Sequence, residues 1–186
     1  ADTVLTGGLV GNILLAAKGE AIGQGSLDFI YKSNYGEFIE KAKTIYARYA
    51  DKIVLPADLG YVENGVRREC RIGAVPTEIC AVDIGSETAR QYESIILAAK
   101  TVFVNGPMGI FEQPETELGT KTVFEALGNT AGYTVVGGGD SVTAAAKYQV
   151  KDKLGYVCTG GGALIRFLTG EELPVVKALR HAAAAL

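Results

Sequence analysis

The sequence predicts an α/β fold: a three-layer, doubly wound and mostly parallel sheet with helices on both faces and a small antiparallel hairpin. Short apolar runs alternate with helical patterns along the chain, as they do in parallel sheets. Two of these runs end in three consecutive glycines, at residues 137–139 and 160–162, and each triplet opens a helix. A third observation is Asn64–Gly65, a dipeptide typical of a two-residue hairpin turn.

The composition fits a single soluble domain. The 186 residues are 48% hydrophobic and 21% charged, so residues 1–186 can bury one core and are expected to form one domain. A net charge of -3 without a Lys/Arg cluster argues against a nucleic-acid partner. No apolar run approaches the ~20 residues that cross a membrane, and no basic segment precedes an apolar stretch at the start of the given sequence. Cys70, Cys80 and Cys158 lack metal-ligand spacing, which favours inert thiols in the reducing cytoplasm.

The expected elements follow from hydrophobic periodicity and from turn residues. They are strand 2–6, helices 9–17 and 35–50, strand 52–56, hairpin arms 61–63 and 66–71, strand 79–84, helix 86–99, strand 101–104, helix 116–127, strand 133–136, helix 140–147, strand 156–158, helix 163–168 and a last helix from 171 that frays at 182–185. Strand 2–6 has almost no lead-in, which suggests that the chain begins partway through a domain. Residues 18–26 read as a Gly-rich connector.

Several elements carry more specific expectations. Helix 9–17 is apolar on nearly all faces and should be well buried, and the aromatic stripe of helix 35–50 is assigned to the core. Strand 79–84 is expected to belong to the main sheet, and Ser86 to cap the next helix. His181, the only histidine, is expected to be exposed on the last helix.

Arg67 and Arg68 on the hairpin have two interpretations. Adjacent arginines can clamp an anion, but on an exposed hairpin they are more commonly solvated. We expect the second situation here.

The longest stretch rich in turn residues is 105–119, which follows strand 101–104. Asn105 stands at the carboxyl end of that strand, where ligands of parallel α/β sheets bind. Its amide can donate to a phosphate, and the carboxylate of Glu112 can accept both hydroxyls of a ribose. The alternative is a strand-to-helix loop whose Asn and Glu cap nearby backbone. Met108 can pack in the core or form part of an adenine wall.

The two glycine triplets predict an anion site. Glycines let the backbone approach a ligand closely, and each following helix offers unpaired N–H groups at the positive end of its dipole. A single triplet is also explained by a tight turn from a strand into a packed helix. Two triplets after successive strands favour one polyanion held between them.

Three segments, 105–112, 135–145 and 158–179, resemble the signature blocks of phosphoglycerate kinase, in the family's order and at nearly its spacing. Weaker matches lie at 6–19, 55–61 and 117–127. The residues of the GLV and GPMG segments are closer to archaeal than to bacterial members. The resemblance implies the C-terminal, nucleotide-binding domain of a two-domain enzyme. The N-terminal domain, which holds 3-phosphoglycerate, and the opening of the C-terminal domain are not matched.

The resemblance also implies a set of nucleotide contacts, with Mg²⁺ and ATP or ADP as the ligands. Those contacts are Gly7 and Gly8 near the adenine, Ala81 and Pro107 beside the nucleotide, Asn105 at the phosphates, Glu112 at the ribose, and Gly138, Gly139, Asp140, Ser141 and Thr159 along the phosphate turns. Asp140 would hold Mg²⁺ through its carboxylate. The catalytic groups would be backbone N–H groups of Gly139, Gly160, Gly161 and Gly162, directed at the transferred phosphoryl group.

Three positions depart from the family pattern. Ser141 stands where Thr is commoner and keeps the hydroxyl, Ala81 stands where many relatives have Gly, and Cys158 replaces a frequent Ser. Other nucleotide-binding classes fit less well. The dinucleotide fingerprint requires a third glycine where Val142 stands, and the P-loop pattern does not occur. A non-catalytic nucleotide-binding α/β module remains the alternative.

Overall fold

The fold is described from a computed structural model that describes residues 1–184. Its elements are β1 (Val4–Leu5), α1 (Gly8–Lys18), α2 (Gln24–Lys32), α3 (Glu37–Tyr49), β2 (Ile53–Val54), β3 (Asp58–Glu63), β4 (Val66–Arg71), β5 (Asp83–Ile84), α4 (Ser86–Ala98), β6 (Thr101–Asn105), α5 (Leu118–Asn129), β7 (Tyr133–Gly137), α6 (Gly139–Lys147), a 3-10 turn (Lys151–Lys153), β8 (Tyr156–Cys158), α7 (Gly161–Leu168) and α8 (Pro174–Ala184). None of the described helices is long and apolar enough to span a membrane.

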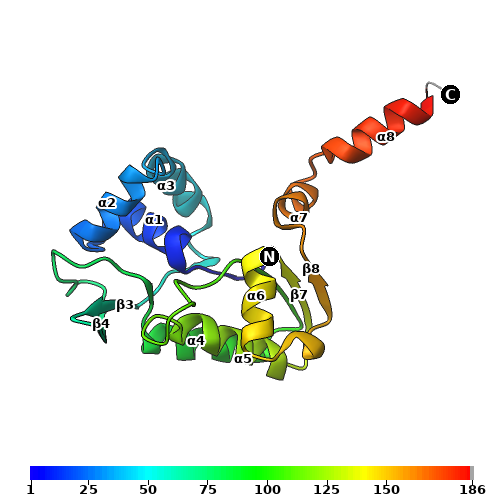
Figure 1. The fold of residues 1–186 in the computed structure, drawn as a ribbon. Coiled ribbons are helices and arrows are strands. Elements are labelled where there is room, and N and C mark those ends of the chain that lie inside the picture. The colour runs from blue at the N-terminus through cyan, green and yellow to red at the C-terminus, as the bar shows by residue number, and fades with distance from the viewer. Residues whose placement is uncertain (185–186) are drawn as a thin grey trace.

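The predicted α/β class is confirmed, with parallel sheets flanked by helices and a small antiparallel sheet (Figure 1). β1 pairs with β2 in parallel, and β6, β7 and β8 form a parallel sheet in that order. The predicted hairpin is present as β3 and β4, joined through Asn64–Gly65. Asn105 pairs with Gly137, which in turn pairs with Cys158. The carboxyl ends of the three parallel strands therefore meet at one edge.

Two hydrophobic clusters hold these elements. The larger joins α4, α5 and α6 to the β6–β7–β8 sheet around the fully buried Tyr92, Phe124 and Val136. The second is built around α1, α2 and α3, where Leu15 and Ile30 are nearly inaccessible to solvent. Figure 1 shows α1, α2 and α3, coloured blue to cyan, gathered on one side of the chain.

Helix α2 was not predicted, because Gly23 and Gly25 made the surrounding stretch read as a connector. It buries Ser26 and Ile30 and leaves Phe29 and Tyr31 exposed. The prediction that the aromatic stripe of α3 is core is also wrong for most of the stripe. Only Ile39 and Ala42 of that helix are buried. The smaller hydrophobic cluster packs against only one side of α3. Larger residues on its other sides, such as Phe38, Ile45 and Tyr49, therefore remain 40–50% exposed.

The stretch predicted as strand 79–84 of the main sheet is different in the structure. Only β5 is a strand, and it pairs antiparallel with β3 instead of joining the parallel sheet. Ser86 is not the N-cap of α4, because Gly85 occupies that position. The carboxylate of Asp58 accepts hydrogen bonds from the N–H groups of Glu87 and Thr88 at 3.0 and 2.8 Å. A buried residue from β3 therefore caps the helix, which periodicity within the helix could not reveal.

Helix α1 runs one residue beyond each end of its prediction and exposes Val10, so it is buried on one side only. At the other end of the chain, α7 and α8 have no buried residues and α8 projects away from the rest of the molecule (Figure 1). Val175 and Leu179 are 70% and 65% exposed. His181 is exposed as predicted, and the predicted helix end at Ala185 lies outside the described residues.

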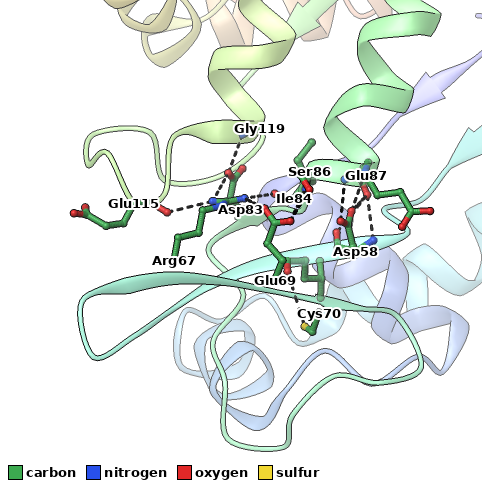
Figure 2. A network of polar contacts seen from close by, with 12 residues as sticks. Asp58, Arg67, Glu69, Cys70, Asp83, Ile84, Ser86, Glu87, Glu115 and Gly119 are labelled. Carbon is green, nitrogen blue, oxygen red and sulfur yellow. Dashed lines mark hydrogen bonds and ion pairs between the residues drawn. The ribbon is translucent and has the colours of Figure 1, made fainter.

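Arg67 ties the hairpin to the larger cluster, as Figure 2 shows. Its partners are the carboxylates of Asp83 and Glu69, both at 3.0 Å, and the carbonyls of Ile84 and Glu115 at 2.9 and 3.2 Å. The expectation of a solvated arginine is therefore wrong for Arg67. It holds for Arg68, which is exposed and 3.7 Å from Glu63. A charge that meets this many acceptors in a mostly buried place stabilises the attachment of the hairpin to β5 and to the loop before α5.

Asp83 is the fully buried member of this network, with a side-chain exposure of 0%. Its Oδ2 accepts hydrogen bonds from Arg67 and from the N–H of Gly119 at 2.8 Å, at the start of α5. Its Oδ1 has no hydrogen-bond partner among the described residues. Burial of the charged form raises the pKa of Asp83 from 3.8 to about 6, and the hydrogen bond from Gly119 and the charge of Arg67 only partly oppose this.

The raised pKa of Asp83 predicts a specific pH dependence of stability. Its stabilising contribution is complete below about pH 4, where the carboxyl is protonated in both states, and is lost as the pH rises through about 6. The difference between the two pKa values corresponds to roughly 3 kcal/mol. In urea unfolding from pH 4 to pH 7, wild type should lose about this much stability relative to Asp83→Asn. Parallel profiles for the two proteins would contradict the prediction.

Candidate functional site

The two glycine turns lie side by side at the carboxyl edge of the β6–β7–β8 sheet. The N–H of Gly138 donates to the carbonyl of Cys158 at 3.0 Å. A Cβ built on Gly161 would lie 3.1 Å from the Cα of Gly138, and Gly138 has a φ of 95°. A side chain at Gly161 would thus be tightly packed against the first turn, and at Gly138 the backbone conformation itself favours glycine.

Both turns lead directly into helices, although at the second turn the N–H of Gly161 already donates to the carbonyl of Thr159 at 3.0 Å. Gly138 and Gly160 are the N-caps of α6 and α7, and within residues 1–184 neither helix has a side-chain cap. A Cβ built on Gly139 or Gly162 would meet no atom within 4 Å. Side chains at these two positions would therefore enter open space, and the N-terminal ends of α6 and α7 are adjacent where Gly161 approaches Gly138. Such an arrangement suits a phosphate-type anion.

Asn105, Asp140 and Thr159 surround this glycine corner. Oδ1 of Asn105 lies 3.0 Å from where a Cβ of Gly138 would be and 3.7 Å from that of Gly161, so this side chain reaches both turns. Asp140 is exposed in the first turn of α6. Thr159 is exposed between β8 and α7. The structure brings all three predicted residues to the same edge.

Ser141 has a different position from the other predicted turn residues. It is completely buried, and its hydroxyl accepts a hydrogen bond from the N–H of Gly106 at 2.7 Å. Its side chain therefore holds the loop after β6. A sequence pattern that places Ser141 beside Asp140 does not distinguish an exposed hydroxyl from a buried one.

The N-terminal glycines contact the same loop. The N–H of Gly8 donates to the carbonyl of Met108 at 2.6 Å, and a Cβ on Gly7 would lie 2.6 Å from the sulfur of Met108. The carbonyl of Pro107 lies 3.4 Å from where a Cβ of Gly8 would be. Gly7, Gly8 and Pro107 are thus neighbours. Met108 packs against the larger cluster, which favours the packing interpretation of this residue.

Glu112 and Ala81 lie in contrasting surroundings. Glu112 is exposed, and its carboxylate accepts a hydrogen bond from the N–H of Phe111 at 3.0 Å. Ala81 is buried in the smaller cluster, and its carbonyl accepts a hydrogen bond from Asn12 at 3.3 Å. The side chain of Ala81 is thus part of the packing around α1, α2 and α3 and not of the glycine corner.

The structure also adds a contact that the sequence did not reveal. The sulfur of Cys158 accepts a hydrogen bond from the N–H of Gly160 at 3.3 Å. The only sequence signal for this hydrogen bond is that Cys158 stands where the family frequently has Ser, whose hydroxyl can also accept within the turn. Among the described residues, no group of three or more His, Cys, Asp or Glu side chains could hold a metal ion. A divalent cation at Asp140 would therefore need phosphate oxygens and water as its remaining ligands, as Mg²⁺ commonly has.

Two surface hollows lie away from the glycine corner. One of about 310 Å³ is lined by Glu117, Lys121, Glu125, Lys147, Tyr148 and Gln149. Another of about 160 Å³ lies over the start of α4 and includes Asp58, Glu69 and Arg90. Charged residues line both hollows, and neither contains a residue of the glycine turns. The geometry of the turns, and not the depth of a hollow, marks the candidate site.

The fold is that of an α/β domain in which two glycine turns meet at the carboxyl edge of a parallel sheet. A sequence model of the family described as Phosphoglycerate kinase matches residues 1–171. The chain is 40% identical over 181 residues to phosphoglycerate kinase of Methanothermobacter thermautotrophicus and 38% identical over 184 residues to that of Pyrococcus abyssi. These matches cover 97% of this chain in both cases, and 44% and 45% of the two relatives. The chain belongs to the phosphoglycerate kinase family.

Solved structures agree with this assignment. The crystal structure of phosphoglycerate kinase from Pyrococcus horikoshii matches with a TM-score of 0.89 at 35% identity, covering 100% of this chain and 47% of that one. Phosphoglycerate kinase from Coxiella burnetii matches with a TM-score of 0.83 at 29% identity, over 95% of this chain and 46% of that one. The chain thus spans about half the length of its relatives and corresponds to their C-terminal half.

The close approach of the two turns predicts opposite effects for two neighbouring glycines. Gly138→Ala places a side chain at a φ of 95° and 3.0 Å from Asn105, which should lower the free energy of unfolding by about 1–3 kcal/mol. Gly139→Ala enters open space inside a helix and should be neutral or stabilise by up to about 1 kcal/mol. Urea unfolding of both variants checks this. Equal effects would mean that the turn is not constrained as described.

Proposed function

We propose that this chain binds Mg-ATP or Mg-ADP as the nucleotide-binding half of phosphoglycerate kinase. That enzyme reversibly transfers a phosphoryl group from 1,3-bisphosphoglycerate to ADP, giving 3-phosphoglycerate and ATP in glycolysis and gluconeogenesis. The observation that carries the proposal is the pair of adjacent helix N-termini, opened by Gly138 and Gly160 and facing one open space. Residues 1–186 are proposed to be the nucleotide-binding domain, incomplete at its N-terminal end.

Each proposed contact follows from a position in the structure. Asn105 reaches both turns, so its amide can donate to phosphate oxygens. Asp140, exposed at the start of α6, is proposed to hold Mg²⁺ between its carboxylate and those oxygens. The exposed carboxylate of Glu112 is proposed to accept from the ribose hydroxyls. Gly7, Gly8 and Pro107, which meet at Met108, are proposed to face the base.

The backbone is proposed to supply the electrostatic part of catalysis. Phosphoryl transfer requires in-line positioning and neutralisation of the charge on the moving group, and little covalent chemistry from the protein. N–H groups of Gly139, Gly160, Gly161 and Gly162 are proposed to meet that charge. Those of Gly160 and Gly161 donate to the sulfur of Cys158 and the carbonyl of Thr159 at 3.3 and 3.0 Å, so they would have to turn to, or be shared with, the ligand. A helix end near water contributes only about 0.3–1 kcal/mol, whereas a well-aimed donor in a dry site is worth roughly 3–4 kcal/mol. The reactants must therefore be enclosed for these groups to act fully.

Enclosure is proposed to require the other half of the enzyme, which binds 3-phosphoglycerate. The open space at Gly139 and Gly162 and the length of the relatives, of which this chain spans 44%, support this view. The three cysteines are free thiols, which suits the proposed location in the reducing cytoplasm. The alternative, a non-catalytic nucleotide-binding module, shares the same turns and would bind nucleotide without contributing to transfer.

The proposed metal role of Asp140 predicts a metal-dependent affinity. Wild type should bind ADP more tightly with Mg²⁺ than with EDTA, and Asp140→Ala should reduce the affinity in Mg²⁺ about tenfold or more while leaving the affinity in EDTA nearly unchanged. Asp152→Ala, which removes another exposed acid, is the control and should behave as wild type. Calorimetric titration measures all three proteins. Full Mg²⁺ dependence in Asp140→Ala would refute the assignment.

The requirement for enclosure predicts that the 186-residue chain alone does not catalyse transfer. With ATP and 3-phosphoglycerate, coupled-enzyme detection of ADP should give no steady 3-phosphoglycerate-dependent rate above background, although the chain binds nucleotide. Adding the separately produced N-terminal half of a relative should restore a rate if the two halves associate. Steady turnover by the chain alone would contradict the proposal.

A further inference from the structure

Two buried hydroxyls hold the loop that follows β6. Ser141 accepts a hydrogen bond from the N–H of Gly106 at 2.7 Å, and Thr120 accepts one from the N–H of Met108 at 3.1 Å. Both residues have an exposure of 0%. Each is the third residue of its helix, Ser141 in α6 and Thr120 in α5. A hydroxyl in the first turn of each helix therefore accepts a hydrogen bond from the same loop, one from the N–H of Gly106 and the other from the N–H of Met108.

The rest of the loop is tied down by neighbouring backbone and by one lysine. The N–H of Ile110 donates to the carbonyl of Val82 at 2.8 Å, and Nζ of Lys147 donates to the carbonyl of Phe111 at 2.5 Å. A Cβ on Gly109 would collide with the carbonyl of Val82, so the loop lies directly on the backbone before β5. A loop held this closely has little room to adopt a second arrangement.

The two hydroxyls lie between the ends of the loop that the proposed function uses. Asn105 directly precedes Gly106, and Glu112 follows Phe111. Neither hydroxyl is exposed, so neither can contact a ligand in this structure. Their effect on a ligand must pass through the loop backbone. A buried N–H that loses its acceptor is costly, and removal of either hydroxyl should therefore release the loop.

We propose that Thr120 and Ser141 are positioning residues of the nucleotide site, which fix the loop so that Asn105 and Glu112 face the same ligand. This inference rests on the proposed nucleotide binding and adds a reason for the family's hydroxyl residue at position 141. Ser141 acts through Gly106, and Thr120 acts through Met108. Neither is a catalytic residue.

The test compares Thr120→Val and Ser141→Ala with a matched control. Thr88→Val removes a hydroxyl that is equally buried but accepts from the N–H groups of Ala57 and Asp58 at 2.9 and 3.1 Å. Amide hydrogen exchange, followed by NMR without nucleotide, reports on the N–H groups of Gly106 and Met108. Calorimetry with ADP and Mg²⁺, at a temperature where every variant is folded, reports on binding.

The expected result separates the three variants. Exchange at Gly106 should accelerate about tenfold or more in Ser141→Ala, and exchange at Met108 likewise in Thr120→Val. Both variants should weaken ADP binding about five- to tenfold, whereas Thr88→Val should change neither exchange nor affinity by more than twofold. Thr120→Ser keeps a hydroxyl and should remain within about threefold of wild type.

Several outcomes would overturn the inference. Unchanged exchange in Ser141→Ala and Thr120→Val would mean that the hydroxyls do not hold the loop. Faster exchange with unchanged affinity would mean that the loop does not position the ligand contacts, and an equal loss in Thr88→Val would indicate general destabilisation. If Thr120→Val does not fold, a tenfold loss in Thr120→Ser decides against the inference. Failure of wild type itself to bind ADP would refute the proposed function and, with it, this inference.

Discussion

The contact between the backbones of Gly138 and Gly161 is the constraint on which the candidate site depends. β7 and β8 are paired so that Gly137 lies opposite Cys158. The segments that follow the two strands therefore leave the sheet at the same level. Because a Cβ on Gly161 would lie 3.1 Å from the Cα of Gly138, a side chain there would push the two helix starts apart by a few tenths of an ångström. The adjacency of two positive helix ends follows from this packing.

A second requirement is that the loop between β6 and α5 stays in place beside those helix ends. This loop contains Asn105 and Glu112, two of the proposed ligand contacts, and it is anchored from several elements at once. Asp83 links the start of α5 to Arg67, so the hairpin also contributes to the position of α5. A buried carboxylate with one unpartnered oxygen is unfavourable for stability at neutral pH.

Much of the fold could be predicted from the sequence because local signals and tertiary structure agree there. The strand, glycine turn and helix of residues 133–147 were recognised from pattern alone, and Asn64–Gly65 gave the hairpin register. Predictions failed where a partner distant in the sequence decides the outcome. Asp58 caps α4 from β3, and Arg67 finds Asp83 across the hairpin. The aromatic residues of α3 are exposed because other elements pack against only one side of that helix, which its own periodicity does not reveal.

The second glycine turn belongs to a part of the molecule that has almost no packing of its own. α7 contains no buried residue, so little besides its backbone hydrogen bonds opposes local unfolding. The anion proposed for this turn would bear the entropy of ordering it, and a partner packed on the apolar side of α7 would remove that cost in advance. On the proposed function, occupancy of the two surfaces would therefore be thermodynamically linked.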